Sequence, residues 1–321
     1  MRPQIYCILL VAMSCLSCEK DEIPVEPFDR GDVESVQIAM GSDYETQVWY
    51  DLSDGKVVST NDRFAWDIAF DCNDSAHFIY LNTSVVMMAA KAEGGAFEDE
   101  IDVASLSFRL DHPSGIKDSL ALGHWWQQSA VWVIDLGYCI NGSKRGYRQM
   151  QFSLTSDNKL TITHAKLDGS DLQSATIAKD DRMNRIAFSF SSNQAVSIDP
   201  PKTDYDIVFT TYTHLFYNPF TPYSVSGVLL NPHQTTAVQI DHLSFEEIDE
   251  TVARETVLTD SADVIGYDWK YYDLDAAQYT VFSNQNYIVR DNEGFYYKLH
   301  FVDFYNDAGE KGFPTMEVQR L

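Results

Sequence analysis

The sequence has few basic residues and no long apolar run inside the chain. Its 321 residues include 23 Lys and Arg against 48 Asp and Glu, which gives a formal net charge of −25. Nucleic-acid-binding proteins neutralise phosphates with clustered Lys and Arg, so this composition argues against a nucleic-acid partner. A helix that spans a bilayer needs about 20 consecutive apolar residues, and the body of the chain has no such run. We therefore expect an acidic body without a membrane-spanning helix.

The short signatures of common enzymes are missing as well. The sequence contains no Gly-x-Ser-x-Gly elbow, no phosphate-cradling glycine-rich loop and no zinc-protease motif. Among 48 acidic residues, a pair of carboxylates carries no specificity without geometry. We therefore predict a binding protein rather than an enzyme, with neither catalytic residues nor a metal site built from side chains alone.

Cysteine is scarce, with five residues in the whole chain. Cys7, Cys15 and Cys18 lie at the N-terminus, which leaves Cys72 and Cys139 in the body. One possible bridge does not make a disulfide framework, and the spacing does not resemble a zinc site. Whether Cys72 and Cys139 pair stays open at this point.

The N-terminal residues have the organisation of a secretory signal, with Arg2 ahead of an apolar stretch. Leu16-Ser17-Cys18 resembles the lipobox of bacterial lipoproteins, in which the cysteine is acylated and becomes the mature N-terminus. The acidic residues 19–22 resemble the export tag of Bacteroidetes surface lipoproteins. The sequence thus predicts a signal peptide over 1–17, acyl chains such as palmitate on Cys18, and a tether over 18–32. The expected location is the cell surface, with the outer membrane touched only through the lipid anchor.

The body has the residues to build a core, since 45% of the chain is hydrophobic and 13% aromatic. Polar and apolar residues alternate with the period of a β-strand in segments 147–154, 159–164, 205–209 and 286–290. Asp54-Gly55 between two strand-like segments predicts a hairpin. Helical periodicity is confined to 245–257, where a short helix could form. The predicted fold is all-β, with antiparallel sandwich or curved-sheet modules.

The chain also repeats itself weakly, and Asp67 and Asp206 take matching positions in the repeat. The matching segments are VWYDLSDGKVV (48–58) with IAFSFSSNQAV (186–196), FAWDIAF (64–70) with TDYDIVF (203–209), and GYRQMQF (146–152) with FYYKLHF (295–301). The pairs occur in the same order at nearly the same offset, which predicts two tandem β modules over 33–178 and 184–321. The alternative is that strands resemble one another by composition.

These segments resemble the HmuY family of Bacteroidetes surface lipoproteins, best known as heme-binding proteins. The first module carries WDIAF (66–70), then Asn82, then GGAF (94–97), in the order found in the family. The second carries NYIVRDNEGFYYKLHFVDFYN (286–306) followed by a closing strand over 309–321. Known members are commonly single modules, so this chain departs from the family in its length.

The resemblance implies a surface-anchored, hemophore-like lipoprotein that acquires heme iron, with heme as its cofactor. A TonB-dependent outer-membrane receptor is the implied recipient. Known members ligate iron with two His or Met side chains. The matching stretch of the second module, 269–273, contains neither, unless Tyr271 or Tyr272 serves as a phenolate ligand. The first module offers His112 and His124 as axial ligands, with Met88 as a substitute.

Other residues of the first module would complete a heme site. Trp125 and Trp126 are possible stacking surfaces for the porphyrin. Lys144, Arg145 and Arg148 form the densest basic cluster and could contact the propionates. Each candidate also has a purely structural interpretation: Met88 as core filler, His112 in a solvated turn, and His124 in a loop beside a buried tryptophan pair.

The remaining histidines have structural interpretations. His164 and His300 alternate on strands, while His77, His214, His233 and His242 are expected in or near turns.

Two aromatic clusters support another function. They comprise Tyr212, Phe216, Tyr217, Phe220 and Tyr223 in one segment, and Tyr267, Trp269, Tyr271 and Tyr272 in another. Exposed Tyr and Trp form platforms for sugar rings or anchors for a protein partner. The alternative function is therefore a non-heme glycan- or protein-binding lipoprotein that keeps the fold. It needs at least part of these clusters to be exposed.

Overall fold

The computed structural model describes residues 31–321, except 74–76, 93–96, 98, 100 and 128. The predicted signal peptide, the lipidation site Cys18 and most of the tether lie outside the described residues, as do residues 94–96 of the GGAF segment. Within the described part of the chain, no helix is long and apolar enough to cross a membrane.

The structure is nearly all β, and every strand pairing is antiparallel, so the predicted fold class is confirmed. Sheet I runs in the order β1 (Glu34–Gln37), β20 (Lys311–Arg320), β19 (Tyr296–Tyr305), β18 (Asn286–Arg290), β15 (Thr236–Ile240). Sheet II is β14 (Phe220–Leu230), β13 (Ile207–Tyr217), β2 (Thr46–Asp51), β3 (Lys56–Asp62). Sheet III is β12 (Gln194–Val196), β11 (Arg185–Ser189), β4 (Ile68–Asp71), β5 (Ile79–Leu81). Sheet IV is β10 (Gln173–Ile177), β9 (Leu160–Ala165), β8 (Tyr147–Leu154), β7 (Val131–Asp135), β6 (Met88–Ala92).

Shorter elements connect these sheets. A separate hairpin consists of β16 (Lys270–Asp273) and β17 (Gln278–Val281). The helical turns are η1 (Thr83–Val85), η2 (Val103–Ser105), η3 (Lys117–Ser119), η4 (Trp125–Gln127), η5 (Phe245–Glu247) and α1 (Glu250–Glu255). The helix expected within 245–257 is therefore split into η5 and α1. The side chain of Asp249 caps α1 by accepting a hydrogen bond from the Val252 amide at 2.9 Å.

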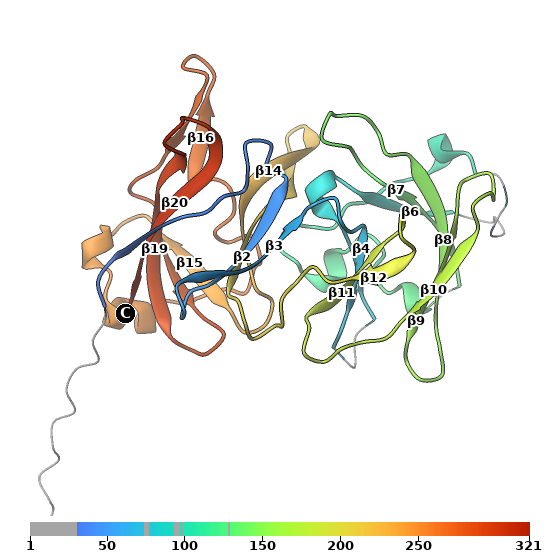
Figure 1. Cartoon of the computed structure of the whole chain (residues 1–321), viewed down its shortest axis with the longest axis horizontal. Helices are drawn as coiled ribbons and strands as arrows, with labels where there is room; N and C mark the ends of the chain where they lie inside the picture. The colour runs from blue at the N-terminus through green and yellow to red at the C-terminus, as the bar shows by residue number, and fades with distance from the viewer. Residues whose placement is uncertain (1–30, 74–76, 93–96, 98, 100, 128) are drawn as a thin grey trace, which may run out of the picture. The chain divides into compact units, whose positions relative to one another are not determined.

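Apolar cores fill the spaces between successive sheets, so the sheets stack in the order I, II, III, IV (Figure 1). The alternation of side chains along each inner strand directs them to opposite cores. In β2, Tyr50 faces the core between sheets I and II, whereas Trp49 faces the core between sheets II and III. In β4, Phe70 faces the core between sheets III and IV, whereas Ala69 faces the central one. The central strands of the two inner sheets, β2, β13, β4 and β11, are therefore buried on two faces, which explains their apolar runs.

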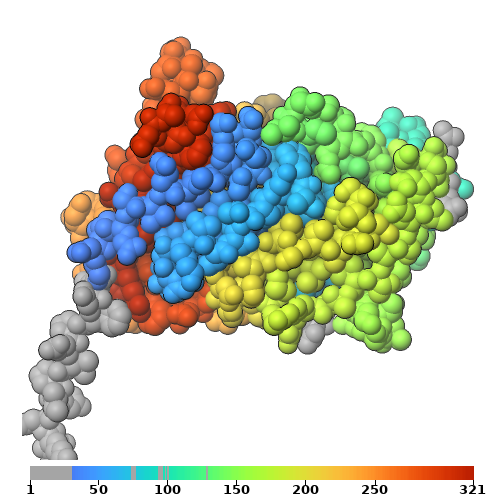
Figure 2. Space-filling model, in the orientation of Figure 1, coloured from blue at the N-terminus to red at the C-terminus, as the bar shows by residue number. Residues whose placement is uncertain are grey.

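Strands from the two sequence repeats are exchanged between the inner sheets. The hairpin β2–β3 precedes β4 in the chain but pairs with β13, and the hairpin β11–β12 precedes β13 but pairs with β4. The first edge strand follows the same rule, since β1 pairs with β20. Figure 2 accordingly shows the blue N-terminal strands against the red C-terminal ones.

The strand pairings can be compared with the predicted module boundaries, which stay a prediction. β1, β2 and β3 were expected in a first module over 33–178, but they pair only with one another and with strands of the second half of the chain. Strands β4 to β12 form sheets III and IV as one continuous stretch inserted into the strands that form sheets I and II. Residues Gly31–Leu321 form one compact unit, and the division at 178–184 is not confirmed.

Candidate functional site

A cluster of histidine and aromatic rings lies at the start of β5 and beside η4. The ring of Trp126 contacts His124 with centroids 4.9 Å apart, Phe78 at 4.9 Å and His77 at 5.5 Å. Phe78 and His124 also meet edge to face at 5.4 Å. His77 and Phe78 lie directly before β5, His124 lies directly before η4, and Trp126 lies in η4. Two segments nearly 50 residues apart in the sequence therefore meet here. We call these four residues the His–Trp cluster.

The two imidazoles of the His–Trp cluster are in different environments. The side chain of His124 is 46% exposed, and its Nε2 lies 3.4 Å from Oδ1 of Asp118. The Nδ1 atom of His77 is buried and has no hydrogen-bond partner among the described residues. Burial lowers the pKa of His77, followed by a smaller contribution from the Lys179 charge. A neutral imidazole with an unused nitrogen is a suitable metal ligand.

A lysine lies next to the same cluster. Nζ of Lys117 is 5.3 Å from the centroid of the Phe78 ring and forms an ion pair with Asp71 at 3.0 Å. Its side chain is partly exposed, so it can reach an anionic group at the surface. Two imidazoles, the ring of Trp126 and the cation of Lys117 thus lie close together in this part of the molecule.

Of the predicted stacking residues, only Trp126 takes part in this surface. Trp125 is buried in the core between sheets III and IV, and its Nε1 donates a hydrogen bond to the carbonyl of His77 at 2.6 Å. Trp125 therefore holds the His77 segment against η4. This bond places the two arms of the His–Trp cluster together.

The other predicted ligands lie elsewhere, and no contact joins the side chains of His112 and His124 within the described part of the chain. His112 lines a cavity between sheets II and III, where its Nδ1 is 2.8 Å from Oγ of Ser114. Met88 is half-buried in β6, opposite Asp135 of β7. The pairing of His112, His124 and Met88 as axial ligands stays a prediction.

Each residue of the predicted basic cluster is paired with a carboxylate. Nζ of Lys144 lies 2.8 Å from Asp135, a guanidinium nitrogen of Arg145 lies 2.6 Å from Asp67, and one of Arg148 lies 2.5 Å from Asp171. Arg148 also contacts Nδ1 of the buried His164 at 2.9 Å. All three cations thus have a partner within the folded chain, and their contact with heme propionates stays a prediction. Sequence reasoning missed His77 and Lys117; the aromatic pair His77-Phe78 directly ahead of a buried strand was the available signal.

The aromatic clusters of the second half are divided between core and surface. Tyr212 and Trp269 are buried, and the Trp269 ring stacks on Phe301 at 3.9 Å. The exposed members are Phe216, Tyr217, Phe220 and Tyr223 at the end of the β13–β14 hairpin and Tyr271 and Tyr272 on β16. Tyr217 is 61% exposed. The condition for the alternative function, partial exposure, is therefore met.

The cysteines of the body are both free, with Cys72 buried and Cys139 exposed. Burial raises the pKa of the Cys72 thiol, so this residue is an unreactive core thiol.

The sequence matches the family described as HmuY protein over residues 43–317, so the chain belongs to the HmuY family. No curated protein matches the sequence.

Solved structures give only weak similarities. Apo PinO from Porphyromonas gingivitis shares 10% identity over 91% of this chain and 98% of its own, with a TM-score of 0.31. The apo HmuY analog of Tannerella forsythia shares 12% identity over 90% and 95%, with a TM-score of 0.26. A candidate HmuY-like heme binding protein from Bacteroides vulgatus shares 14% identity over 90% and 94%, with a TM-score of 0.23. At these scores the similarities carry no argument.

Proposed function

We propose that this protein binds heme at its surface and takes part in heme and iron acquisition. Membership of the HmuY family over residues 43–317 is the observation that carries the proposal. The lipobox ending at Cys18 and the acidic residues 19–22 support a lipid-anchored position on the outer membrane, from which a TonB-dependent receptor would receive the heme.

The His–Trp cluster is the proposed heme site. His124 supplies an exposed axial donor and the partly exposed His77 a second imidazole, and both contact the Trp126 ring. The partly buried Trp126 provides the apolar surface for the macrocycle, with the buried Phe78 ring packed against it at 4.9 Å, and Lys117 provides a cation for a propionate. The cavity that contains His112 does not suit heme, because its volume of about 120 Å³ is below the range of about 300–1,000 Å³ for drug-sized ligands.

Titration of the purified protein with hemin, followed by the Soret absorption band, tests this site. The wild type should show a saturable shift, and His124→Ala and His77→Ala should weaken binding by about tenfold or more through loss of an axial ligand. His242→Ala is the matched control, because this imidazole is exposed and its one ionic contact within the described residues is with Asp241, at 3.6 Å. A wild-type titration without saturation contradicts heme binding. If both variants bind hemin as tightly as the wild type, the heme site lies elsewhere, and His112 and Met88 are the next residues to substitute.

The second candidate function is recognition of a glycan or protein by the β13–β14 hairpin. Its support is the group of four exposed aromatic side chains at one hairpin end, namely Phe216, Tyr217, Phe220 and Tyr223. Such rings give contact area at low entropic cost. A glycan or surface-protein array probed with the wild type and with Tyr217→Ser/Tyr223→Ser separates the two functions. Loss of array binding with an unchanged hemin titration favours the second, and absence of any wild-type signal contradicts it.

A further inference from the structure

The cavity between sheets II and III lies where the two halves of the fold meet. Its walls come from both inner sheets, and its volume of about 120 Å³ is slightly less than that of an engineered cavity of about 150 Å³ that binds benzene. A ligand of a few non-hydrogen atoms fits such a space. The cavity is therefore distinct from the proposed heme site, and a ligand could occupy it whether or not the protein binds heme.

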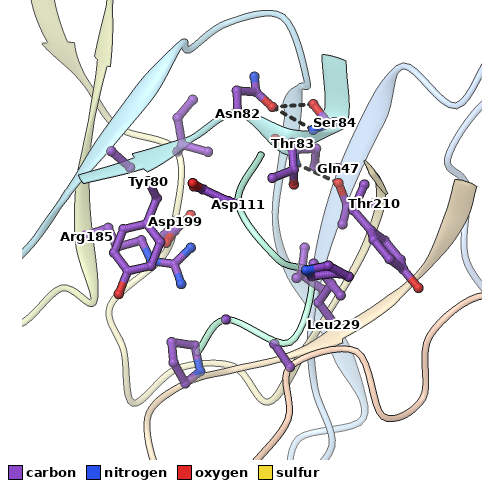
Figure 3. Close-up of a pocket in the computed structure, with 18 of the residues that line it drawn as sticks. Gln47, Tyr80, Asn82, Thr83, Ser84, Asp111, Arg185, Asp199, Thr210 and Leu229 are labelled. Carbon is purple, nitrogen blue, oxygen red and sulfur yellow. Dashed lines mark hydrogen bonds between the residues drawn. The ribbon is translucent and has the colours of Figure 1, made fainter. Parts of the chain in front are cut away.

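Arg185 of β11 is at one end of this cavity, with its guanidinium against the ring of Tyr80 (Figure 3). Its Cζ is 3.8 Å from the centroid of that ring. Within the described residues the guanidinium has no hydrogen bond and no ion pair. Asp71 lies opposite Arg185 in the strand register, but its carboxylate is engaged by Lys117 at 3.0 Å, the Asn73 amide at 2.8 Å and the Tyr80 hydroxyl at 3.3 Å. The five N–H donors of the guanidinium are thus left without an acceptor from the described part of the protein.

The internal repeat supplies a comparison for this arginine. Ile68 pairs with Phe188 in sheet III, and Ile207 pairs with Tyr50 in the same way in sheet II. Phe188 and Tyr50 are therefore equivalent. Arg185 and Gln47, each three residues earlier in its strand, are then equivalent as well. Gln47 lies at the opposite end of the same cavity (Figure 3). Its amide is fully engaged: Nε2 donates to Oγ1 of Thr210 at 2.7 Å, and Oε1 accepts from Asn61 and from Trp66, each at 3.0 Å. The fold therefore accepts an uncharged, self-satisfied residue at this position, and the unpaired cation is a feature of one half only.

A carboxylate without a partner lines the same cavity. Asp199 makes no hydrogen bond and no ion pair in the described structure, and it does not pair with Arg185. Burial raises its pKa to about 6, and the charge of Arg185 opposes this effect. The other acid of the cavity, Asp111, is fully used, because its two oxygens accept from the amides of Leu81 at 2.7 Å and Ala121 at 2.8 Å. One cation and one carboxylate thus remain open to a ligand, with aromatic and aliphatic walls around them.

We propose that this cavity binds a small zwitterion, a free amino acid with a short side chain. Its carboxylate is held by the planar fork of Arg185, and its ammonium group lies against Asp199. The side chain packs on the apolar wall that Leu81 and Ile198 contribute. A simple anion would satisfy Arg185 and leave the acid of Asp199 unpaired, whereas a zwitterion compensates both charges. The volume excludes large side chains.

Isothermal titration of the purified protein with alanine, propionate, ethylamine and tryptophan tests the proposal. Alanine should bind one molecule per chain, and propionate and ethylamine should bind at least about tenfold more weakly because each lacks one of the two charges. Tryptophan should show no binding at this site. Absence of saturable alanine binding overturns the proposal, and propionate that binds as tightly as alanine overturns the role of Asp199.

Two variants locate the binding. Arg185→Gln introduces the residue found at the equivalent position, so it should fold, and it should abolish alanine binding. Asp199→Asn should weaken alanine binding by about tenfold while leaving propionate unchanged or improved, since it removes a negative charge. Circular dichroism confirms the fold of both, and unchanged hemin titrations in both separate this site from the heme site. Alanine affinity equal to that of the wild type in Arg185→Gln overturns the proposal.

Discussion

Asp67 and Asp206 make the same backbone hydrogen bonds at equivalent positions of the two halves. The amide of Asp67 donates to the carbonyl of Phe188 and that of Asp206 to the carbonyl of Tyr50, both at 2.9 Å. Each carboxylate also accepts, through Oδ2, a hydrogen bond from the backbone amide two residues after the residue whose carbonyl the aspartate amide contacts. Phe190 donates to Asp67 at 2.7 Å and Leu52 donates to Asp206 at 2.9 Å.

Asn82 and Asn231 extend this correspondence. Their amides donate to the carbonyls of Asp67 and Asp206 at 2.9 and 2.8 Å, and their side chains bond the residues just before these aspartates, Trp66 at 2.8 Å and Tyr205 at 2.6 Å. These similar buried hydrogen bonds at matched positions agree with the weak repeat of the sequence. These networks join each exchanged hairpin to the strand of the other half.

The two aspartates differ at Oδ1, and this difference predicts unequal effects of substitution. Oδ1 of Asp67 accepts from Arg145 at 2.6 Å, whereas that of Asp206 accepts from the backbone and side-chain amides of Asn292 at 3.1 and 3.0 Å. Asp67→Asn should lower the free energy of unfolding by about 2–4 kcal/mol, because it leaves the charge of Arg145 unpaired. Asp206→Asn should cost less, about 1–2 kcal/mol, since no cation is stranded.

Urea denaturation of both variants near neutral pH measures these losses, and exposed Asp181→Asn serves as the control. Equal losses for the two substitutions would show that the Arg145 ion pair contributes little.

Gly137 illustrates a position where the fold requires glycine. Its φ is +72°, and a methyl group there would overlap the carbonyl oxygen of Val85, which accepts a hydrogen bond from the Tyr138 amide at 3.0 Å. Gly137→Ala should therefore destabilise the protein by about 2–4 kcal/mol, from both the left-handed conformation and the clash.

Gly142→Ala in the same loop is the matched control for Gly137→Ala. Its φ is +77°, but nothing lies within 4 Å of a methyl group built there, so only the conformational cost of about 1 kcal/mol applies. Thermal melts of the two variants compare the effects. If the two variants lose the same amount of stability, the close approach of residue 137 to the carbonyl of Val85 does not contribute to the loss.

Lys270 makes stability depend on pH. It is buried, its Nζ donates to the carbonyl of Ser226 at 2.6 Å and lies 4.1 Å from the centroid of the Trp269 ring, and burial lowers its pKa to about 7. The unfolded chain keeps the ordinary pKa of about 10.5 and so binds more protons than the folded one between these values. The lysine therefore destabilises the fold most below its folded pKa, and this penalty declines as the pH rises.

Lys270→Met removes the titrating group. It also leaves the carbonyl of Ser226 without its donor, but this loss of stability is the same at every pH. The stability of the wild type relative to Lys270→Met should rise by about 2–3 kcal/mol between about pH 6 and about pH 9. Denaturation curves at the two pH values measure this difference. A constant difference would mean that the ammonium group is solvated in the folded protein.

Much of the fold was predictable because its strands alternate and its turns carry strong signals. The alternation over 286–290 predicts β18 residue for residue, and Asp54-Gly55 joins β2 to β3 as expected. The repeat containing Asp67 and Asp206 was also visible in the sequence. The exchange of hairpins was not, because the alternation of β2 specifies which side chains face each core but not whether β4 or β13 is its partner strand.

The candidate site was predictable only in part. His124 and Trp126 were singled out because the family resemblance points to them, whereas His77 was assigned to a turn. Nothing local to the sequence links His77 to η4; the hydrogen bond from Trp125 to its carbonyl does. The predicted cations Lys144, Arg145 and Arg148 have carboxylate partners that only the folded chain reveals.

By itself, the sequence determined the strands, the repeat and the family, because side-chain alternation, turn residues and short motifs are local properties. The tertiary structure alone decided which half each hairpin joins, which imidazoles meet, and which charges stay unpaired. Gln47 and Arg185 hold equivalent places in the repeat, yet one is saturated and the other open, because the contacts that satisfy a buried group come from residues far away in the chain.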